Sequence, residues 1–232
     1  MKTAVMMRIF LLASLLAILS MPAHSQNFDA DINILFGMPQ TDFRESLDRN
    51  ALGLNGSIAF RIPRLPLHAG LELGIMTYGR ERRREQLSPT IPEIQLEVRT
   101  DYDIFTSHLF LRFEPEIHGI RPYVDGLVGI KYLFTESSIR DDDGFGEDIA
   151  STTNYDDSSF SYGAGGGIKV EVYDGGRDSY MINLKARYLF GAEASYLQPG
   201  SIDTDRGGNL IFDESVSGTD LLTIHLGMTY KF

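Results

Sequence analysis

The feature that most constrains this chain is a two-residue periodicity in its final stretch, Thr219 to Phe232. Every second position there is apolar, namely Leu222, Ile224, Leu226, Met228, Tyr230 and Phe232. The intervening positions are mostly small or polar, namely Thr223, His225, Gly227, Thr229 and Lys231. Successive side chains of a β-strand point to opposite faces, so this pattern predicts a strand with one apolar and one polar face.

The same alternation recurs along the chain and predicts eight strands. Their expected ranges are Phe28–Phe36, Ala51–Ile62, Leu67–Tyr78, Glu97–Glu114, Pro122–Thr135, Phe160–Val172, Tyr180–Phe190 and Thr219–Phe232. The connections between them alternate long and short, with long loops at Gly37–Asn50, after Tyr78, at Ser137–Asp157 and at Ala192–Gly218. Short turns on one side and long loops on the other are typical of membrane barrels. The sequence therefore predicts an all-β fold, an eight-stranded antiparallel up-and-down transmembrane β-barrel.

The amino terminus has the features of a removable signal peptide. Lys2 and Arg8 precede an apolar run, Ile9–Leu19, and small residues lead up to Ser25. The run is roughly eleven residues long, whereas a membrane-spanning helix needs about 20. We expect residues 1–25 to be cleaved and residues 26–232 to form one outer-membrane barrel domain.

Composition excludes several classes of function. The formal net charge is -11, and such an acidic chain repels the phosphates of nucleic acid. Cysteine is absent, which excludes disulfides, thiolate metal sites and thiol nucleophiles.

Alternation alone does not exclude a soluble barrel whose apolar face points inward around a ligand. The polar face favours the membrane barrel, because glycines stand beside isolated charges there, as a crowded interior requires: Gly53, Gly70, Gly74, Gly129, Gly163, Gly165, Gly167 and Gly227. Aromatic residues gather near the long loops at Phe36, Tyr132, Phe134, Phe160, Tyr162, Tyr188 and Phe190. Others gather near the short turns at Phe113, Tyr180, Tyr230 and Phe232. These two groups predict interfacial belts.

Charged residues at inward positions predict a network inside the barrel. They are Arg61, Glu72, Arg112, Asp125, Lys131, Lys169, Glu171, Lys185 and Arg187. They would line a pore or fill a plug, and we favour the plug because eight strands leave an interior just wide enough for side chains. His68, His108 and His225 also face inward, but at different heights, so we expect neither a metal site nor a cofactor.

The long loops carry charges of both signs. Asp141, Asp142 and Asp143 lie beside glycines, but their spacing does not match a calcium-binding loop, so a solvated acidic loop is the prediction. Arg80, Arg82, Arg83 and Arg84 would contact lipopolysaccharide phosphates or these acidic residues, or remain unbound.

Catalysis has little support in the sequence. None of the five histidines is followed two positions later by serine, as in barrel lipid A deacylases, and Gly-x-Ser-x-Gly is missing. We therefore predict that the protein is not an enzyme.

The chain resembles the outer-membrane β-barrel family of the OmpA transmembrane-domain and OmpX type. The signal peptide, the eight alternating strands, the glycine-alternating segment Ser161–Gly167 and the Tyr-Lys-Phe ending at Tyr230–Phe232 carry the resemblance. It implies an integral outer-membrane protein of a Gram-negative bacterium with structural, adhesive or envelope-stabilising roles, and it transfers no catalytic residue. It also implies that Tyr230 and Phe232 form the assembly signal.

The partners implied are outer-membrane lipid, lipopolysaccharide, the barrel-assembly machinery and an extracellular ligand of unknown identity. We expect a monomer with both termini in the periplasm. The alternatives are a narrow solute channel and a lipid-modifying enzyme.

Overall fold

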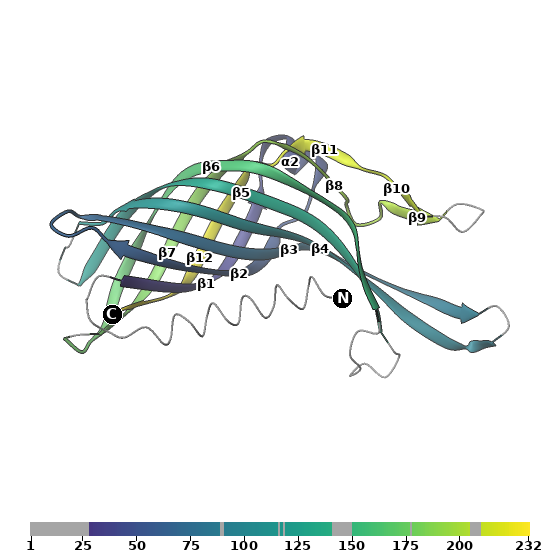
Figure 1. Cartoon of the computed structure of the whole chain (residues 1–232), viewed down its shortest axis with the longest axis horizontal. Helices are drawn as coiled ribbons and strands as arrows, with labels where there is room; N and C mark the ends of the chain where they lie inside the picture. The colour runs from purple at the N-terminus through teal and green to yellow at the C-terminus, as the bar shows by residue number, and fades with distance from the viewer. Residues whose placement is uncertain are drawn as a thin grey trace.

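The computed structural model describes residues 28–88, 91–115, 117, 119–140, 150–176, 178–204 and 210–232. Eight antiparallel strands close into one barrel in the order β1-β12-β7-β6-β5-β4-β3-β2 (Figure 1). Their bounds are β1 Phe28–Pro39, β2 Ala51–Arg61, β3 Leu67–Ser88, β4 Ile91–Phe113, β5 Ile120–Arg140, β6 Ala150–Asp174, β7 Ser179–Gly191 and β12 Leu221–Lys231. The prediction of an eight-stranded up-and-down barrel is confirmed. The predicted signal peptide lies outside the described residues.

The barrel closes between its first and last strands. β1 and β12 pair without a register break from Asp29 opposite Lys231 to Pro39 opposite Leu221. The amide of Phe28 and the carbonyl of Phe232 extend this pairing at 3.2 Å. Among the described residues, closure leaves no unpaired sheet edge around the wall of the barrel, which a lipid environment requires.

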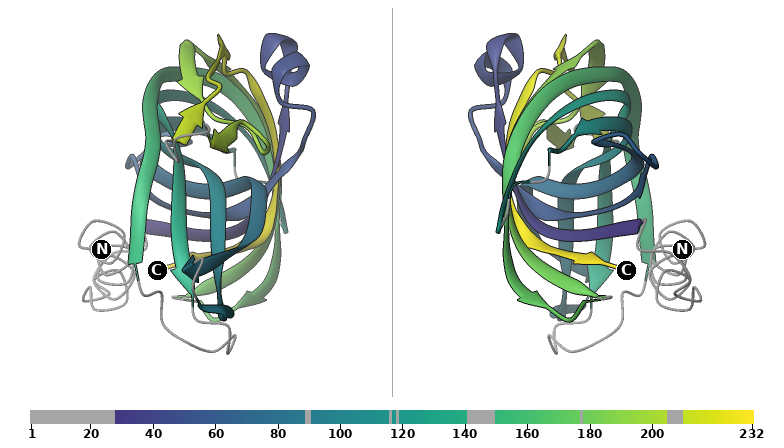
Figure 2. Two further views of the ribbon diagram at one scale, coloured as in Figure 1. Left: turned by 90° about the vertical axis from the view of Figure 1, so that its right-hand side faces the viewer. Right: turned by 90° about the vertical axis from the view of Figure 1, so that its left-hand side faces the viewer.

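The two ends of the barrel differ (Figure 2). At the end called here the turn end, short connections join β2 to β3, β4 to β5 and β6 to β7, and Phe28 and Phe232 lie there. The opposite end, called the loop end, carries five further elements: α2 Thr41–Ser46, β8 Glu193–Tyr196, β9 Ile202–Thr204, β10 Leu210–Phe212 and β11 Ser215–Gly218. β8 pairs with β11 and β9 with β10. The predicted loops Gly37–Asn50 and Ala192–Gly218 therefore contain regular structure.

Four strands extend further toward the loop end than predicted. β3 ends at Ser88 rather than Tyr78, β4 begins at Ile91 rather than Glu97, β5 ends at Arg140, and β6 begins at Ala150. Much of the predicted loop Ser137–Asp157 is thus strand. The reason is that apolar alternation marks only the part of a strand with an apolar face, whereas backbone pairing continues into water.

The outward and inward faces have opposite polarity. Large apolar side chains are exposed along the middle of the outer wall, for example Leu52 at 62%, Leu109 at 62% and Leu226 at 55% exposure. Charged and amide side chains point inward and are buried, as for Arg112 at 0%. Among the described residues, no helix has the length and apolar character to cross a membrane.

Glycine lets the crowded interior form at particular positions. A Cβ on Gly129 would collide with the carbonyl oxygen of Ser107, and one on Gly70 would enter the ring of Phe110. The backbone of β4 therefore lies too close to Gly129 for a side chain there, and the Phe110 ring lies against Gly70.

Candidate functional site

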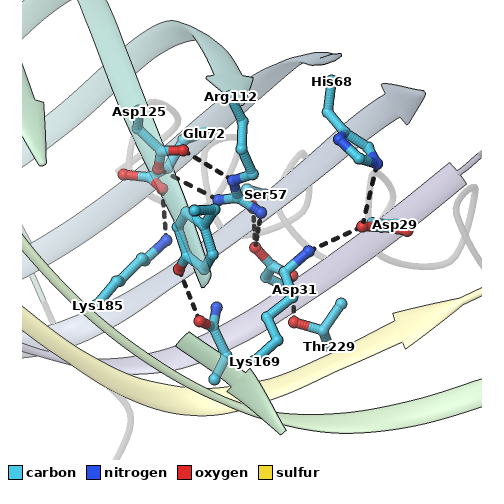
Figure 3. Close-up of polar contacts among 12 residues, drawn as sticks. Asp29, Asp31, Ser57, His68, Glu72, Arg112, Asp125, Lys169, Lys185 and Thr229 are labelled. Carbon is cyan, nitrogen blue, oxygen red and sulfur yellow. Dashed lines mark hydrogen bonds and ion pairs between the residues drawn. The ribbon is translucent and has the colours of Figure 1, made fainter. Parts of the chain in front are cut away.

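The centre of the barrel holds a connected group of ion pairs contributed by four strands (Figure 3). Glu72 on β3 accepts a hydrogen bond from Lys185 on β7 at 2.8 Å and pairs with Arg187. Arg187 also pairs with Asp125 on β5, and Arg112 on β4 donates to the same carboxylate at 2.8 Å through Nε. Each carboxylate therefore binds two cations. Such sharing compensates the cost of burying the charges.

A second group continues this network toward the turn end. Lys169 Nζ lies 2.8 Å from Asp29 Oδ2 and 2.8 Å from Glu114 Oε2. Asp31 accepts hydrogen bonds from the hydroxyls of Ser57 at 2.9 Å and Thr229 at 2.6 Å. Arg112 Nη1 lies 3.7 Å from Asp31 Oδ2 and so links the two groups.

Aromatic and amide side chains fill the space around these charges. The Arg112 guanidinium carbon lies 4.0 Å from the centre of the Tyr123 ring and 5.1 Å from that of Phe110. Both distances fit cation–π contacts. The Tyr123 hydroxyl donates to Asn183 at 2.7 Å. The centre of the barrel is consequently a packed polar core.

The structure separates the nine predicted interior residues into three groups. Six lie in the connected network: Glu72, Arg112, Asp125, Lys169, Lys185 and Arg187. Lys131 is buried elsewhere, where its Nζ donates to the carbonyls of Leu189 and Thr219. Arg61 is half-buried, and Glu171 pairs with Arg121 at 3.1 Å, away from the network.

Sequence reasoning missed three carboxylates of the network, Asp29, Asp31 and Glu114. The alternation of β1 already placed Asp31 on the inward face, and Asp29 is two positions before it. This signal could have identified both. Glu114 lies two positions after the inward Arg112 at the end of the predicted strand Glu97–Glu114, so the same signal could have identified it.

The three inward histidines do not converge within the described residues. His108 Nε2 lies 3.0 Å from the Ser161 hydroxyl, and the two side chains meet across Gly129, which is paired with both residues. His225 Nε2 lies 3.0 Å from the Thr223 hydroxyl. His68 lies beside the carboxylate of Asp29 instead of a hydroxyl. The His108–Ser161 pair arises without a His-x-Ser motif, but both residues are buried in the barrel.

An apolar layer covers the network at the loop end. It contains Leu35, Phe43, Met76, Tyr78, Tyr102, Ile104, Leu133, Tyr196, Leu197 and Leu221. The Tyr78 hydroxyl donates to the Leu197 carbonyl at 2.9 Å, and Phe43 of α2 packs edge-on against Tyr196. Residues of α2 and β8 thus pack over the barrel strands and occupy this end of the interior.

The predicted loop arginines lie on the extension of β3. Arg80 and Arg99 both pair with Asp101, at 2.6 and 2.7 Å. Arg83 donates to the Ile202 carbonyl at 3.1 Å, and Arg82 is exposed. The side chain of Arg84 and the predicted acidic residues Asp141, Asp142 and Asp143 lie outside the described structure.

Aromatic rings border the apolar outer wall at both ends. Near the loop end, the rings of Tyr162 and Phe190 are stacked with centroids 5.2 Å apart. Near the turn end, Tyr230 contacts Tyr180 at 5.0 Å and Phe232 at 5.4 Å. An exposed apolar wall between two aromatic belts matches a lipid bilayer and would aggregate in water. The chain is an eight-stranded transmembrane β-barrel. Closed barrels with such a band span outer membranes, and we assign this barrel to that membrane.

Comparisons with known proteins give similarities in structure and none in sequence. No family model matches the chain, and no curated protein matches it in sequence. Among solved structures, it is similar to Neisserial surface protein A, with 12% identity, a TM-score of 0.46, and coverage of 90% of this chain and 98% of that one. It is also similar to OprG from Pseudomonas aeruginosa, with 16% identity, a TM-score of 0.42, and coverage of 89% and 95%. Ail from Yersinia pestis matches with 15% identity, a TM-score of 0.37, and coverage of 89% and 97%. These are similarities of fold.

Proposed function

We propose that this protein is a non-enzymatic outer-membrane barrel that presents a protruding β-sheet for contact with envelope components or an extracellular ligand. The observation that carries the proposal is the unequal length of the barrel strands. β2 pairs with β3 only as far as Thr77, and β7 pairs with β6 only from Ser161. Beyond these points β3, β4, β5 and β6 continue as a four-stranded extension (Figure 1).

The extension has the properties of a binding surface. Its outer strands, β3 and β6, have no further barrel strand to pair with beyond Thr77 and before Ser161 in the described residues. Such an edge can accept an extended segment of another molecule through backbone hydrogen bonds. The residues Ala150–Ser159 at the β6 edge are mostly polar, so this edge is compatible with exposure to water.

Arginines on the extension could contact an anionic partner. Arg80, Arg82 and Arg99 lie on β3 and β4, and Asp101 pairs with both Arg80 and Arg99. In the proposed orientation, with the turn end and both termini in the periplasm, these arginines stand just outside the loop-end aromatic belt. Lipopolysaccharide phosphates occupy that level, and guanidinium groups bind phosphate bidentately.

The packed interior supports a structural role for the barrel rather than conduction. The shared ion pairs and the apolar layer above them fill the space that a solute would need. We propose that the barrel acts as a monomer and that the barrel-assembly machinery inserts it, with Tyr230 and Phe232 as the assembly signal.

The phosphate contact is tested with purified barrel and vesicles. The triple variant Arg80→Gln, Arg82→Gln, Arg99→Gln should bind lipopolysaccharide-containing vesicles at least tenfold more weakly than the parent barrel. The control variant Arg44→Gln, Arg49→Gln removes two exposed arginines, one in α2 and one just after it, and should bind normally. Equal loss in both variants, or no loss in the triple variant, would refute the proposed contact surface.

A further inference from the structure

The geometry points to a divalent metal site at the turn end of the barrel, formed by Asp29, His68 and Glu114. Asp29 lies on β1, His68 on β3, and Glu114 directly follows β4. One potential ligand atom from each residue lies within 4.8 Å of the others. All three residues are buried, with exposures of 3%, 5% and 2%. The site is separate from the sheet extension of the proposed function.

The setting of His68 is the observation that points to a ligand. Its Nδ1 has no hydrogen-bond partner among the described residues. Its Nε2 points toward Asp29 but stays 3.9 Å from Oδ2, which is longer than a hydrogen bond (Figure 3). The Nδ1 atoms of His108 and His225 also have no partner among the described residues, but each of these histidines places Nε2 3.0 Å from a hydroxyl. His68 has no hydrogen bond at either ring nitrogen among the described residues, which is costly for a buried imidazole, and a metal bond through one nitrogen would reduce that cost.

Lys169 shows that this position holds positive charge. Its ammonium nitrogen lies 2.8 Å from both Asp29 Oδ2 and Glu114 Oε2, so it stands where a metal would bind the two carboxylates. Binding of a metal ion therefore requires the lysine to move. Asp31 lies two positions after Asp29 on the same face of β1 and offers the lysine another carboxylate.

The charge balance of the network is compatible with an added cation. The connected carboxylates are Asp29, Asp31, Glu72, Glu114 and Asp125, whereas the connected lysines and arginines are Arg112, Lys169, Lys185 and Arg187. Five negative charges thus face four positive ones in the described network. If all four basic groups stay charged in the network, a divalent ion changes the net charge of the network from one negative to one positive. The net charge is therefore equally small with and without the ion.

The donor set selects the class of metal. One imidazole and two carboxylates suit Zn²⁺, which binds nitrogen and oxygen at about 2.0–2.2 Å and often keeps a water as fourth ligand. Mn²⁺ accepts the same donors, but imidazole favours zinc in the order of affinities. Bound zinc would join β1, β3 and β4 at the rim, across the intervening β2.

The test uses the complete folded barrel in detergent, without an affinity tag. Calorimetric titration with ZnCl₂ should show saturable 1:1 binding, and Co²⁺ should give a visible absorption band typical of nitrogen and oxygen ligands. His68→Gln and Glu114→Gln should each weaken binding at least tenfold, while the matched control His108→Gln should bind normally. Lys169→Met should bind at least tenfold more tightly, because the competing ammonium is gone.

Folding of every variant is verified by circular dichroism and by the shift in gel mobility on heating. If one of the two ligand variants does not fold, the other ligand variant serves in its place. Absence of saturable binding in both the parent and Lys169→Met would overturn the proposal. Equal affinity in the parent and both ligand variants, or equal loss in the His108→Gln control, would overturn it as well.

Discussion

The Glu72–Lys185 ion pair gives the most quantitative test of the packed interior. The two charged atoms lie 2.8 Å apart and both side chains are almost completely buried. Two unit charges at that distance attract by about 6 kcal/mol at an effective dielectric constant of about 20. Desolvation offsets part of this energy, and removal of one partner of a buried pair costs about 3–5 kcal/mol. We expect Glu72→Gln to lower the free energy of unfolding by that amount.

A double-mutant cycle separates the pair from its surroundings. Lys185→Met should cost about 3 kcal/mol, because Glu72 is left with Arg187 alone. The double variant should lose less free energy of unfolding than the two single variants lose together, by at least about 2 kcal/mol. Arg121→Gln, at the turn end, is the control, and its combination with Glu72→Gln should be additive within about 0.5 kcal/mol.

The assay is equilibrium unfolding by urea of barrels folded into lipid vesicles. The chain contains no tryptophan, so far-ultraviolet circular dichroism and gel mobility report folding. A coupling energy below about 0.5 kcal/mol would refute the reasoning, because it would mean that water, rather than Glu72, surrounds the Lys185 ammonium.

Three further perturbations test the wall, the interior and the assembly of the barrel. Leu226→Arg, which puts a charge on the exposed apolar wall, should cost about 2–4 kcal/mol in vesicle unfolding, and a neutral effect would contradict lipid contact there. Gly129→Val should lower the free energy of unfolding by about 3 kcal/mol, because its side chain would collide with the backbone of β4. Gly126→Val, on the open outer side, should lower it little, and similar losses in the two variants would argue against a crowded interior. Deletion of Tyr230–Phe232 should lower the membrane level of the protein more than deletion of the β9–β10 hairpin, as measured by immunoblot of membrane fractions, and equal levels would argue against the assembly signal.

The sequence predicted the wall of the barrel well because lipid imposes a simple rule on it. Any strand in the bilayer must carry apolar residues at every second position, so the alternation of β12 and β7 marks those strands closely. The rule ends with the bilayer. β3 continues ten residues past the predicted end at Tyr78, since charged residues can pair as strands in water.

The interior could be predicted only in part. Alternation identifies inward positions, but the contacts among them depend on how far the strands are staggered around the barrel. Lys169 reaches Asp29 across 140 positions in sequence, and no local pattern predicts that pairing. Likewise, α2 and its contact between Phe43 and Tyr196 arise within segments that show only loop composition.

We expect the apolar face of every barrel strand to contact lipid while the polar face fills the interior. Because the chain has no cysteine, single-cysteine variants along β12 can carry a spin label without a background signal. Oxygen accessibility in vesicles should be high at Ile224, Leu226 and Met228 and low at Thr223, His225 and Thr229. Accessibility that is high at the second set, or equal in both sets, would contradict the account.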